Sequence, residues 1–205
     1  MKKKKIIIAA AVLLAVFLIG GVIAYFTDTD SATNTFTVGK VEIEVVETNW
    51  NALPDTDEDG IPDEAENMMP GESVTKDPKI HNKSTTNEAY VFAKIESPCT
   101  TGTTALELFD YTNTPGVNSG WELMTNGTCT NGKITRIYSY STSGTMTALA
   151  ANGNTPTLFN SLTLNTNVTG DLPSETNVVI TGYAIQKDGL TATSPSDVWT
   201  AGQFS

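Results

Sequence analysis

The strongest chemical signal in the chain is a run of twelve residues that begins at Asp55 and ends at Glu66. Acidic side chains occupy its first, third and fifth positions, Gly60 follows at the sixth, and the glutamate closes the run. Calcium binds about six to eight oxygen ligands, and the D-x-D-x-D-G-x5-E spacing supplies them from carboxylates and one main-chain carbonyl. We therefore predict a Ca2+ site with these ligands: Asp55, Asp57, Asp59, the carbonyl of Ile61, Asp63 and Glu66.

A hydrated acidic loop without an ion is the alternative, because Asp and Gly are common in surface turns. Pro62 stands where helix–loop–helix calcium sensors carry an apolar residue with a free N–H, and no long flanking helices are evident. The segment is therefore more similar to the shorter Asp-rich calcium loops of thrombospondin type 3 repeats and dockerins. We expect a structural ion and not a calcium switch.

Hydrolytic chemistry has little support in the sequence. His81 is the only histidine, whereas a zinc hydrolase generally needs several imidazole or thiolate ligands, and the chain contains no H-E-x-x-H. A G-x-S-x-G nucleophile motif is also missing. We interpret His81 as a surface histidine, name no catalytic residue and do not expect an enzyme.

The two cysteines, Cys99 and Cys129, are an even number in a chain that we expect to be exported, and both lie in stretches rich in Thr, Gly and Asn. We predict that they form one disulfide, with free thiols as the alternative. Closing a loop of this length stabilises a fold by about 3–4 kcal/mol in the chain-entropy model. The pair is therefore expected to be structural.

The expectation of export comes from the amino terminus. Four lysines at positions 2–5 precede an uncharged apolar stretch at 6–23, and small residues lead to a cleavage site between Ala24 and Tyr25. We predict a signal peptide at 1–24. The alternative is an uncleaved anchor, because eighteen apolar residues approach the minimum length of a membrane span.

The charge balance of the remaining chain excludes one class of partner. Removing residues 1–24 takes away four of the twelve basic residues and leaves eight against 23 acidic ones, a net charge of −15. Such a surface repels nucleic acid and anionic lipid. We expect no nucleic-acid partner, and membrane contact only through an uncleaved signal segment.

Residues 25–205 are dense in Thr, Asn, Ser and Gly and carry short runs of alternating β-forming residues. This pattern predicts an all-β fold, a jelly-roll-like antiparallel sandwich in one domain, with the acidic segment at 55–66 between strands. The expected strands are residues 35–47, 73–81, 88–96, 120–124, 133–140, 145–149, 157–164 and 177–187. The runs at 90–95 and 178–185 are apolar on both faces, which is typical of central strands.

Two finer expectations concern the ends of this domain. In the first strand a one-residue slip at Gly39-Lys40 brings the apolar residues to a common face, so we predict a bulge there, with Glu42 and Glu44 facing water. We also expect one or two short helices, near 63–68 and near 196–201. In the second, Ser196 is the expected cap and Trp199 is expected to pack inward.

Three stretches resemble the camelysin/TasA family of exported proteins. They are AYFTDTDSATNTFTVG at 24–39, MPGESVTKDPKI at 69–80 with Asn82 and NEAYV at 87–91, and YAIQ at 183–186 followed by Trp199. The second stretch is similar to the family's P-G-x-x-x-x-K-x-P-x-x-x-N and A-Y-V section. Residues 97–175 match weakly, and the acidic segment at 55–66 resembles an insertion relative to the shortest members.

The resemblance implies a jelly-roll subunit of extracellular biofilm-matrix fibres, secreted by a Gram-positive bacterium and processed by a SipW-type signal peptidase. It also implies that the segment after the cut pairs with the sheet of a neighbouring copy, head to tail, with Phe26, Phe36 and Val38 as anchors. For residues 34–47 an intramolecular first strand is an equal alternative. The rival functions are a camelysin-like surface metalloprotease and a monomeric, calcium-stabilised adhesin.

Overall fold

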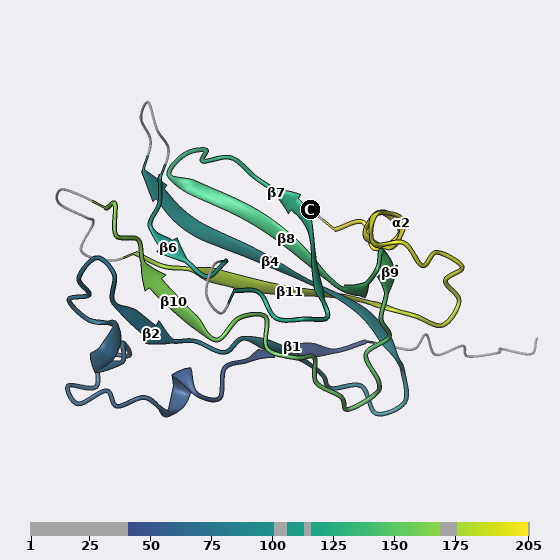
Figure 1. Cartoon of the computed structure of the whole chain (residues 1–205). Coiled ribbons are helices and arrows are strands. Elements are labelled where there is room, and N and C mark those ends of the chain that lie inside the picture. The colour runs from purple at the N-terminus through teal and green to yellow at the C-terminus, as the bar shows by residue number, and fades with distance from the viewer. Residues whose placement is uncertain (1–40, 101–105, 113–115, 169–175, 205) are drawn as a thin grey trace, which may run out of the picture. The chain divides into compact units, whose positions relative to one another are not determined.

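The computed structural model describes residues 41–100, 106–112, 116–168 and 176–204, and residues 39–205 form one compact unit (Figure 1). The described residues contain eleven β-strands, two 3-10 helices and one α-helix. In chain order these elements are β1 (Ile43–Val46), η1 (Trp50–Ala52), η2 (Asp63–Ala65), β2 (Ser73–Thr75), β3 (Lys79–Asn82), β4 (Ala89–Thr100), β5 (Leu106–Glu107), β6 (Phe109–Asp110), β7 (Trp121–Asn126), β8 (Lys133–Thr142), β9 (Thr145–Met146), β10 (Ser161–Leu164), β11 (Val179–Gln186) and α2 (Pro195–Ala201).

The larger layer is an antiparallel sheet with strand order β11-β4-β8-β7. Strand β4 lies inside it, because it pairs with β11 along one edge and with β8 along the other. Both faces of β4 are covered: Val91 and Phe92 point to opposite faces and both have an exposed fraction of 0%. The apolar run predicted for this strand therefore reflects burial on two sides.

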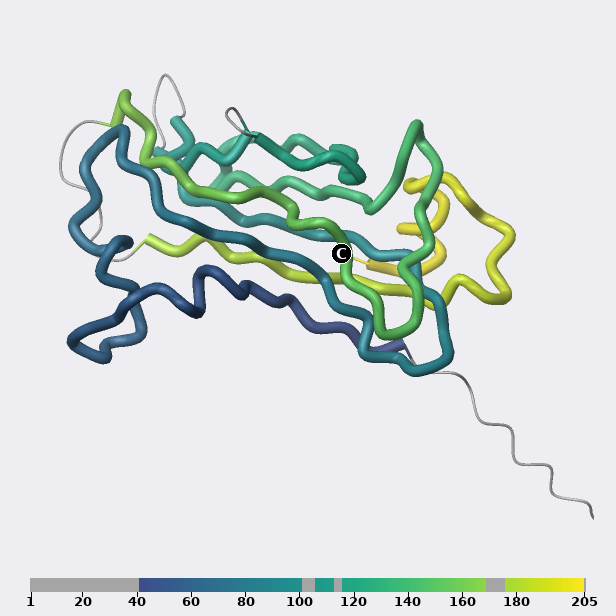
Figure 2. Tube along the Cα trace, turned by 60° about the horizontal axis from the view of Figure 1, so that its bottom comes forward, coloured from purple at the N-terminus to yellow at the C-terminus, as the bar shows by residue number. Residues whose placement is uncertain are grey.

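The second layer is formed by two smaller antiparallel groups, β1-β3 and β2-β10-β6. Strands β2 and β3 follow each other in the chain, so these groups lie end to end in one layer (Figure 2). The main core fills the space between the layers, where Val91 and Ile95 of β4 pack in one cluster with Val74, Ile80 and Leu162. Two facing antiparallel sheets around such a core make an antiparallel β-sandwich, which confirms the predicted fold class.

The outer face of the larger sheet is covered by the carboxyl-terminal segment. Helix α2 begins after Ser194, whose side chain accepts a hydrogen bond from the Asp197 N–H. Trp199 then packs edge-on against Phe92, with ring centroids 5.1 Å apart, and also contacts Phe204. The predicted inward packing of Trp199 is confirmed.

Most predicted strands are present, with shifted ends, but four details differ. The segment expected as one strand at 73–81 is two, because residues 76–78 separate β2 from β3, and strands β5 and β6 were not predicted. Ser194 caps α2, so the expected cap at Ser196 is wrong: Pro195 already stands inside the first turn. The helix expected near 63–68 is the single 3-10 turn η2.

Strand β11 was expected at the centre of a sheet, and this prediction is wrong. Among the described residues β11 pairs with β4 alone. Its sequence is apolar on both faces because other elements cover it. Tyr183 packs under Trp199 of α2, while on the inner face Ile43 of β1 approaches so closely that a Cβ at Gly182 would lie 3.1 Å from its Cδ1.

In the first strand, Glu42 and Glu44 have side chains about half exposed and both lie near the Lys83 ammonium, which confirms that they face water. The predicted bulge at Gly39-Lys40 lies outside the described residues. Within the part of the chain that the structure describes, no helix has the length and apolar character to cross a membrane.

Candidate functional site

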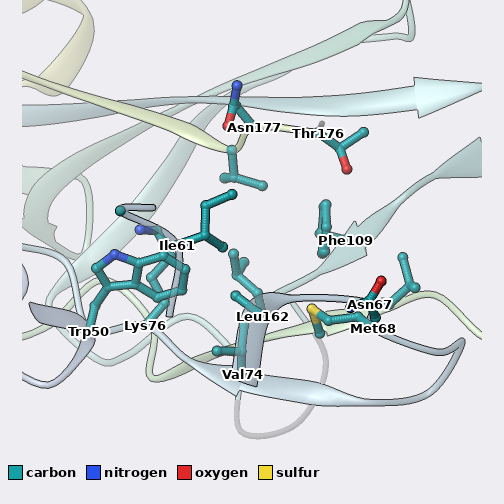
Figure 3. Close-up of a pocket in the computed structure, with 14 residues that line it drawn as sticks. Trp50, Ile61, Asn67, Met68, Val74, Lys76, Phe109, Leu162, Thr176 and Asn177 are labelled. Carbon is teal, nitrogen blue, oxygen red and sulfur yellow. The ribbon is translucent and has the colours of Figure 1, made fainter. Parts of the chain in front are cut away.

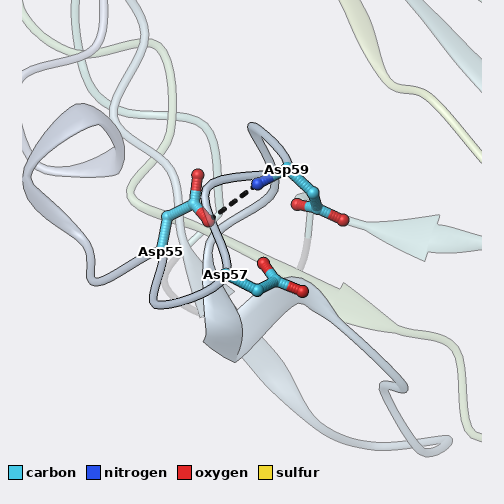
Figure 4. Close-up of side chains that lie close together, drawn as sticks. All are labelled: Asp55, Asp57 and Asp59. Atoms are coloured by element: carbon cyan, nitrogen blue, oxygen red, sulfur yellow. Dashed lines mark hydrogen bonds between the residues drawn. The ribbon is translucent and has the colours of Figure 1, made fainter.

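The acidic segment forms an exposed loop that follows η1 and contains η2 near its end, and its first half is held by hydrogen bonds from its own backbone (Figure 4). The Asp55 carboxylate accepts the N–H groups of Asp59 (3.2 Å) and Gly60 (2.9 Å). The chain reverses sharply, with φ of 61° at Glu58 and 89° at Gly60. Glycine adopts the second of these angles without steric cost. The sequence thus folds the first half of the loop around the first aspartate.

Three of the six predicted calcium ligands are brought together. Oxygen atoms of Asp55, Asp57 and Asp59 all lie within 4.8 Å of one another. Asp63 points elsewhere, because its Oδ1 accepts hydrogen bonds from the N–H and hydroxyl of Thr56. The Ile61 N–H donates a hydrogen bond to the Asp59 carboxylate at 2.8 Å.

Glu66 lies within electrostatic reach of the three gathered aspartates. The pKa of Glu66 is raised above its ordinary value. The largest cause is repulsion from the Asp57 carboxylate, followed by partial desolvation and then by repulsion from Asp59, Asp63 and Asp55. Like charges at this density repel, and a divalent cation would relieve the repulsion. The donor set consists only of oxygen, which suits Ca2+ or Mg2+ and not a soft metal. The residues fit a cation at the first three positions, while Asp63 would have to turn toward it.

His81 lies on β3 and is half-buried. Its Nδ1 is 3.1 Å from the carbonyl oxygen of Gly153, and its backbone pairs with Glu44 and with Asn154. Because one ring nitrogen contacts a main-chain carbonyl, the position has a structural explanation. His81 keeps partial exposure to solvent, so the interpretation as a surface histidine stays a prediction.

The predicted disulfide between Cys99 and Cys129 is confirmed, with the two Cα atoms 6.0 Å apart. It joins the end of β4 to the connection between β7 and β8. This link ties the β7–β8 hairpin to β4 at one end of the larger sheet.

The motif residues at 76–82 are structural, a role that the sequence did not reveal. Asn82 is completely buried, and its side-chain amide donates to the carbonyl oxygens of Asn87, Leu149 and Ala150, at 2.9, 3.3 and 3.1 Å. Pro78 is also fully buried. These contacts tie β3 to two neighbouring loops, so this part of the motif maintains the fold.

Lys76 and Asp77 of the same motif hold the chain that follows β1. The Lys76 ammonium lies 2.8 Å from a Glu47 carboxylate oxygen and 4.1 Å from the centre of the Trp50 ring. The Asp77 carboxylate accepts the N–H groups of Asn49 (2.8 Å) and Trp50 (3.2 Å). Together they fix residues 47–50 at the margin of the second layer.

Beside this clamped segment a cavity of about 580 Å³ opens between the two layers (Figure 3). We call it the interlayer groove. Its walls combine buried core residues with the acidic loop, and the side chains that matter below are Trp50, Ile61, Met68, Val74, Phe109 and Leu162. Sequence reasoning missed the groove because its lining comes from segments far apart in the chain. The exposed position of Ile61, an apolar residue inside an acidic loop, was the one available signal.

Five predicted residues lie outside the described part of the chain. They are the cleavage pair Ala24 and Tyr25 and the strand-exchange anchors Phe26, Phe36 and Val38. The cleavage site and the anchor roles therefore remain predictions.

Comparison with known proteins bears on the amino-terminal half. The model of the camelysin metallo-endopeptidase family matches residues 1–101. The match covers the signal-like segment, the acidic loop and the motif at 76–82, and it confirms the resemblance noted from the sequence. No curated protein and no solved structure matches the chain.

Proposed function

We propose that this chain, whose residues 1–101 belong to the camelysin family, is an exported structural subunit that joins copies of itself into extracellular fibres. Its signal-like segment supports export and release by a SipW-type signal peptidase after Ala24. The protein would then act in the extracellular matrix, or at the surface, of a Gram-positive bacterium. The partner on this proposal is a second copy, and assembly is head to tail.

The observation that carries the proposal is one unfinished side of the sandwich. Among the described residues, β11 pairs only with β4 along its eight residues, and β1 pairs only with β3. Both unpaired edges lie on the same side, since β1 packs against β11 at Gly182. An uncovered strand edge presents free N–H and C=O groups, and a strand from another chain can satisfy them.

The amino-terminal arm, residues 25–40, is the segment available for this pairing. Residues 25–33 are too polar to form a core strand alone, whereas Phe36 and Val38 alternate with polar residues as a strand on an apolar surface requires. On this proposal Phe26, Phe36 and Val38 anchor the donated strand. Because donor and acceptor are different surfaces, such pairing is heterologous and generates filaments unless the rotation closes a ring.

Electron microscopy and sedimentation of the mature chain, residues 25–205, test the proposal. We expect filaments from the mature chain and soluble monomer when residues 25–33 are deleted. A matched pair refines the result: Phe26→Ser with Phe36→Ser should reduce assembly, while Thr27→Ser with Thr33→Ser should not. A mature chain that stays monomeric at high concentration contradicts the proposal and favours the adhesin.

A camelysin-like protease is the second candidate, because the matching family is described as a metallo-endopeptidase. No contact among the described residues favours it. The chain has a single histidine, and both cysteines form the disulfide. Zinc-dependent cleavage of an unfolded substrate that disappears in His81→Ala would establish this function.

We further propose that the acidic loop holds a structural Ca2+ ion. The gathering of Asp55, Asp57 and Asp59 and the raised pKa of Glu66 support this assignment. The cation would neutralise the loop and fix its conformation, and no catalytic step is assigned to it. The thermal test of this ion is given in the Discussion.

A further inference from the structure

The interlayer groove has the size and the floor of a site for a small organic molecule. Its volume of about 580 Å³ lies within the range of ligand pockets in proteins, about 300–1,000 Å³. Val74 of β2 and Leu162 of β10 form the floor, with exposed fractions of only 2% and 4%, and Phe109 and Met68 add apolar surface beside them (Figure 3). The groove therefore offers an apolar surface on which the carbon skeleton of a ligand can be buried.

One wall of the groove carries a high density of negative charge. Gly60, Ile61 and Ala65 of the acidic loop belong to the lining, and residues 55–66 contain seven acidic side chains and no basic one. A cleft bordered by charges of one sign concentrates ions of the opposite sign. The groove therefore favours a cationic ligand and disfavours an anionic one.

Lys76 is the single charged side chain among the described residues that line the groove. Its ammonium lies 2.8 Å from a Glu47 carboxylate oxygen and 4.1 Å from the centre of the Trp50 ring, and its side chain is only 10% exposed. The ion pair contributes no net charge, so the acidic loop determines the sign of the potential in the groove. The same contact is an ammonium held between an aromatic ring and a carboxylate, which is how proteins commonly bind organic cations.

We propose that the interlayer groove binds a small organic cation, an ammonium group carried on an apolar body. The body lies on the floor formed by Val74, Leu162 and Phe109, and the ammonium faces the acidic loop beside Ile61. Burial of apolar surface supplies the affinity, and the charge of the loop supplies the preference for a cation over an anion. This site differs from the proposed calcium ion, whose ligands are oxygens within the loop, and it does not depend on fibre assembly. Because the volume suits a small molecule, a free amine is the ligand to which we commit.

Three probes of similar size and different charge test the proposal on the mature chain, residues 25–205. They are phenethylamine, which is an ammonium at neutral pH, the neutral phenethyl alcohol, and the anionic phenylpropionate. Titrations followed by NMR are performed with chelator, so that no calcium ion neutralises the loop. We expect the amine to bind about tenfold more tightly than the carboxylate, with the alcohol between them. The amide signals of Ile61 and Val74 should shift during the titration.

Two outcomes of this series overturn the inference. The first is the absence of saturable binding by phenethylamine, and the second is equal binding of the three probes. A short lysine-containing peptide is a further arm of the experiment. If it binds more tightly than phenethylamine at the same amide signals, the groove is a peptide site and the choice of a free amine is wrong.

A pair of double variants tests the role of the loop charge. Glu58→Gln with Glu64→Gln removes two negative charges from the loop and leaves every proposed calcium ligand in place. We expect the affinity for phenethylamine to fall about threefold. Glu42→Gln with Asp188→Asn removes two charges outside the lining of the groove and should leave the affinity unchanged. Equal affinities of the two double variants would show that the acidic loop does not select the ligand.

A second pair tests the apolar contact at the rim. Ile61→Asn should weaken the binding of phenethylamine and of phenethyl alcohol alike, because both bury the same apolar body. Leu123→Asn, at a residue of similar exposure on β7, should weaken neither. Unchanged binding in Ile61→Asn would place the ligand outside the groove. Circular dichroism of each variant verifies that it is folded.

Discussion

The two sides of the sandwich differ in how completely their polar groups and strand edges are satisfied. On the side of β7 and β8, Arg136 binds Glu107 at 2.6 Å, Tyr111 at 2.9 Å and Asn126 at 2.8 Å. On the side of β1, β2 and β11, strand edges lack partners among the described residues, and Glu47 keeps one buried carboxylate oxygen without a hydrogen bond. We call these the closed side and the open side.

This contrast separates scaffold from candidate interface. Buried polar groups are normally paired, and a strand edge is normally covered or disrupted. The closed side follows the second rule, because its last strand, β7, carries a register shift between Leu123 and Thr125 that interrupts an edge. It departs from the first rule only at a neutral group, the buried Ser97 hydroxyl of β4, which has no hydrogen-bond partner among the described residues. The open side breaks both rules in one place, next to the interlayer groove. Among the described residues, this incomplete region is therefore the candidate interface for the proposed assembly.

The largest expected effect is on the closed side. Arg136→Met leaves the Glu107 carboxylate, whose side chain is only 15% exposed, without its cation. We expect a loss of about 3 kcal/mol in the free energy of unfolding, at the lower end for buried pairs because both side chains retain some solvent contact. Urea unfolding measures it. The double variant Arg136→Met with Glu107→Met should recover part of the loss, and a single variant as stable as wild type would contradict the closed-side description.

The second effect concerns the acidic loop on the open side. Calcium at a hundredfold excess over its dissociation constant should stabilise the mature chain by about 2.7 kcal/mol, because it binds only the folded loop. Asp57→Asn with Asp59→Asn should abolish this gain, and Asp188→Asn, at an exposed aspartate elsewhere, should not. Thermal unfolding with calcium or chelator provides the measurement. An unchanged melting temperature in wild type would mean that the loop is only hydrated.

A smaller effect is expected from the clamp on the open side. Lys76→Met removes the ion pair with Glu47 and the contact with Trp50, but residues 47–50 lie beyond the end of β1 and can turn toward water. We expect a loss of about 2 kcal/mol, the lower end of the sum of one charged hydrogen bond (about 1.5–3 kcal/mol) and one cation–π contact (about 0.5–2 kcal/mol). Urea unfolding beside Lys133→Met, at an exposed lysine, checks it. A loss equal to that of Arg136→Met would show that the open side is as rigid as the closed one.

The smallest effect is a pH dependence on the closed side. The Glu122 carboxylate accepts hydrogen bonds from the Ser141 hydroxyl at 2.6 Å and the Gly144 N–H at 3.0 Å, and these lower the pKa of Glu122. A lowered pKa in the folded state means that the unfolded state binds more protons in the acid range. This stabilisation is therefore present above the ordinary pKa of glutamate and disappears as the pH falls through the lowered pKa.

Ser141→Ala removes the larger of these two contributions to the pKa of Glu122. The stability difference between wild type and variant should shrink as the pH falls. Urea unfolding at a series of acidic pH values measures that difference. A difference that does not depend on pH would assign the effect to packing of the buried Ser141 side chain.

Local patterns in the sequence predicted much of the fold. The alternating and apolar runs identified β4, β8 and β11, because a strand face that is buried needs apolar residues at every second position. The spacing of aspartates and Gly60 similarly predicted a tight loop that gathers Asp55, Asp57 and Asp59. The break between β2 and β3 was missed, since it depends on the buried contacts of Lys76 and Asp77 with residues 47–50.

By itself, the sequence determined an all-β chain with an acidic turn, a disulfide and a family relationship, because each depends on neighbouring residues or on residue type. Only the tertiary structure decided that, among the described strands, β11 lies at the edge of its sheet and β1 leaves the second layer before β2. Those features depend on which distant segments compete for the same backbone groups. The sequence pattern of one segment does not show which other segment pairs with it once the layers pack. The interlayer groove lies where the chain after β1 turns away from β2.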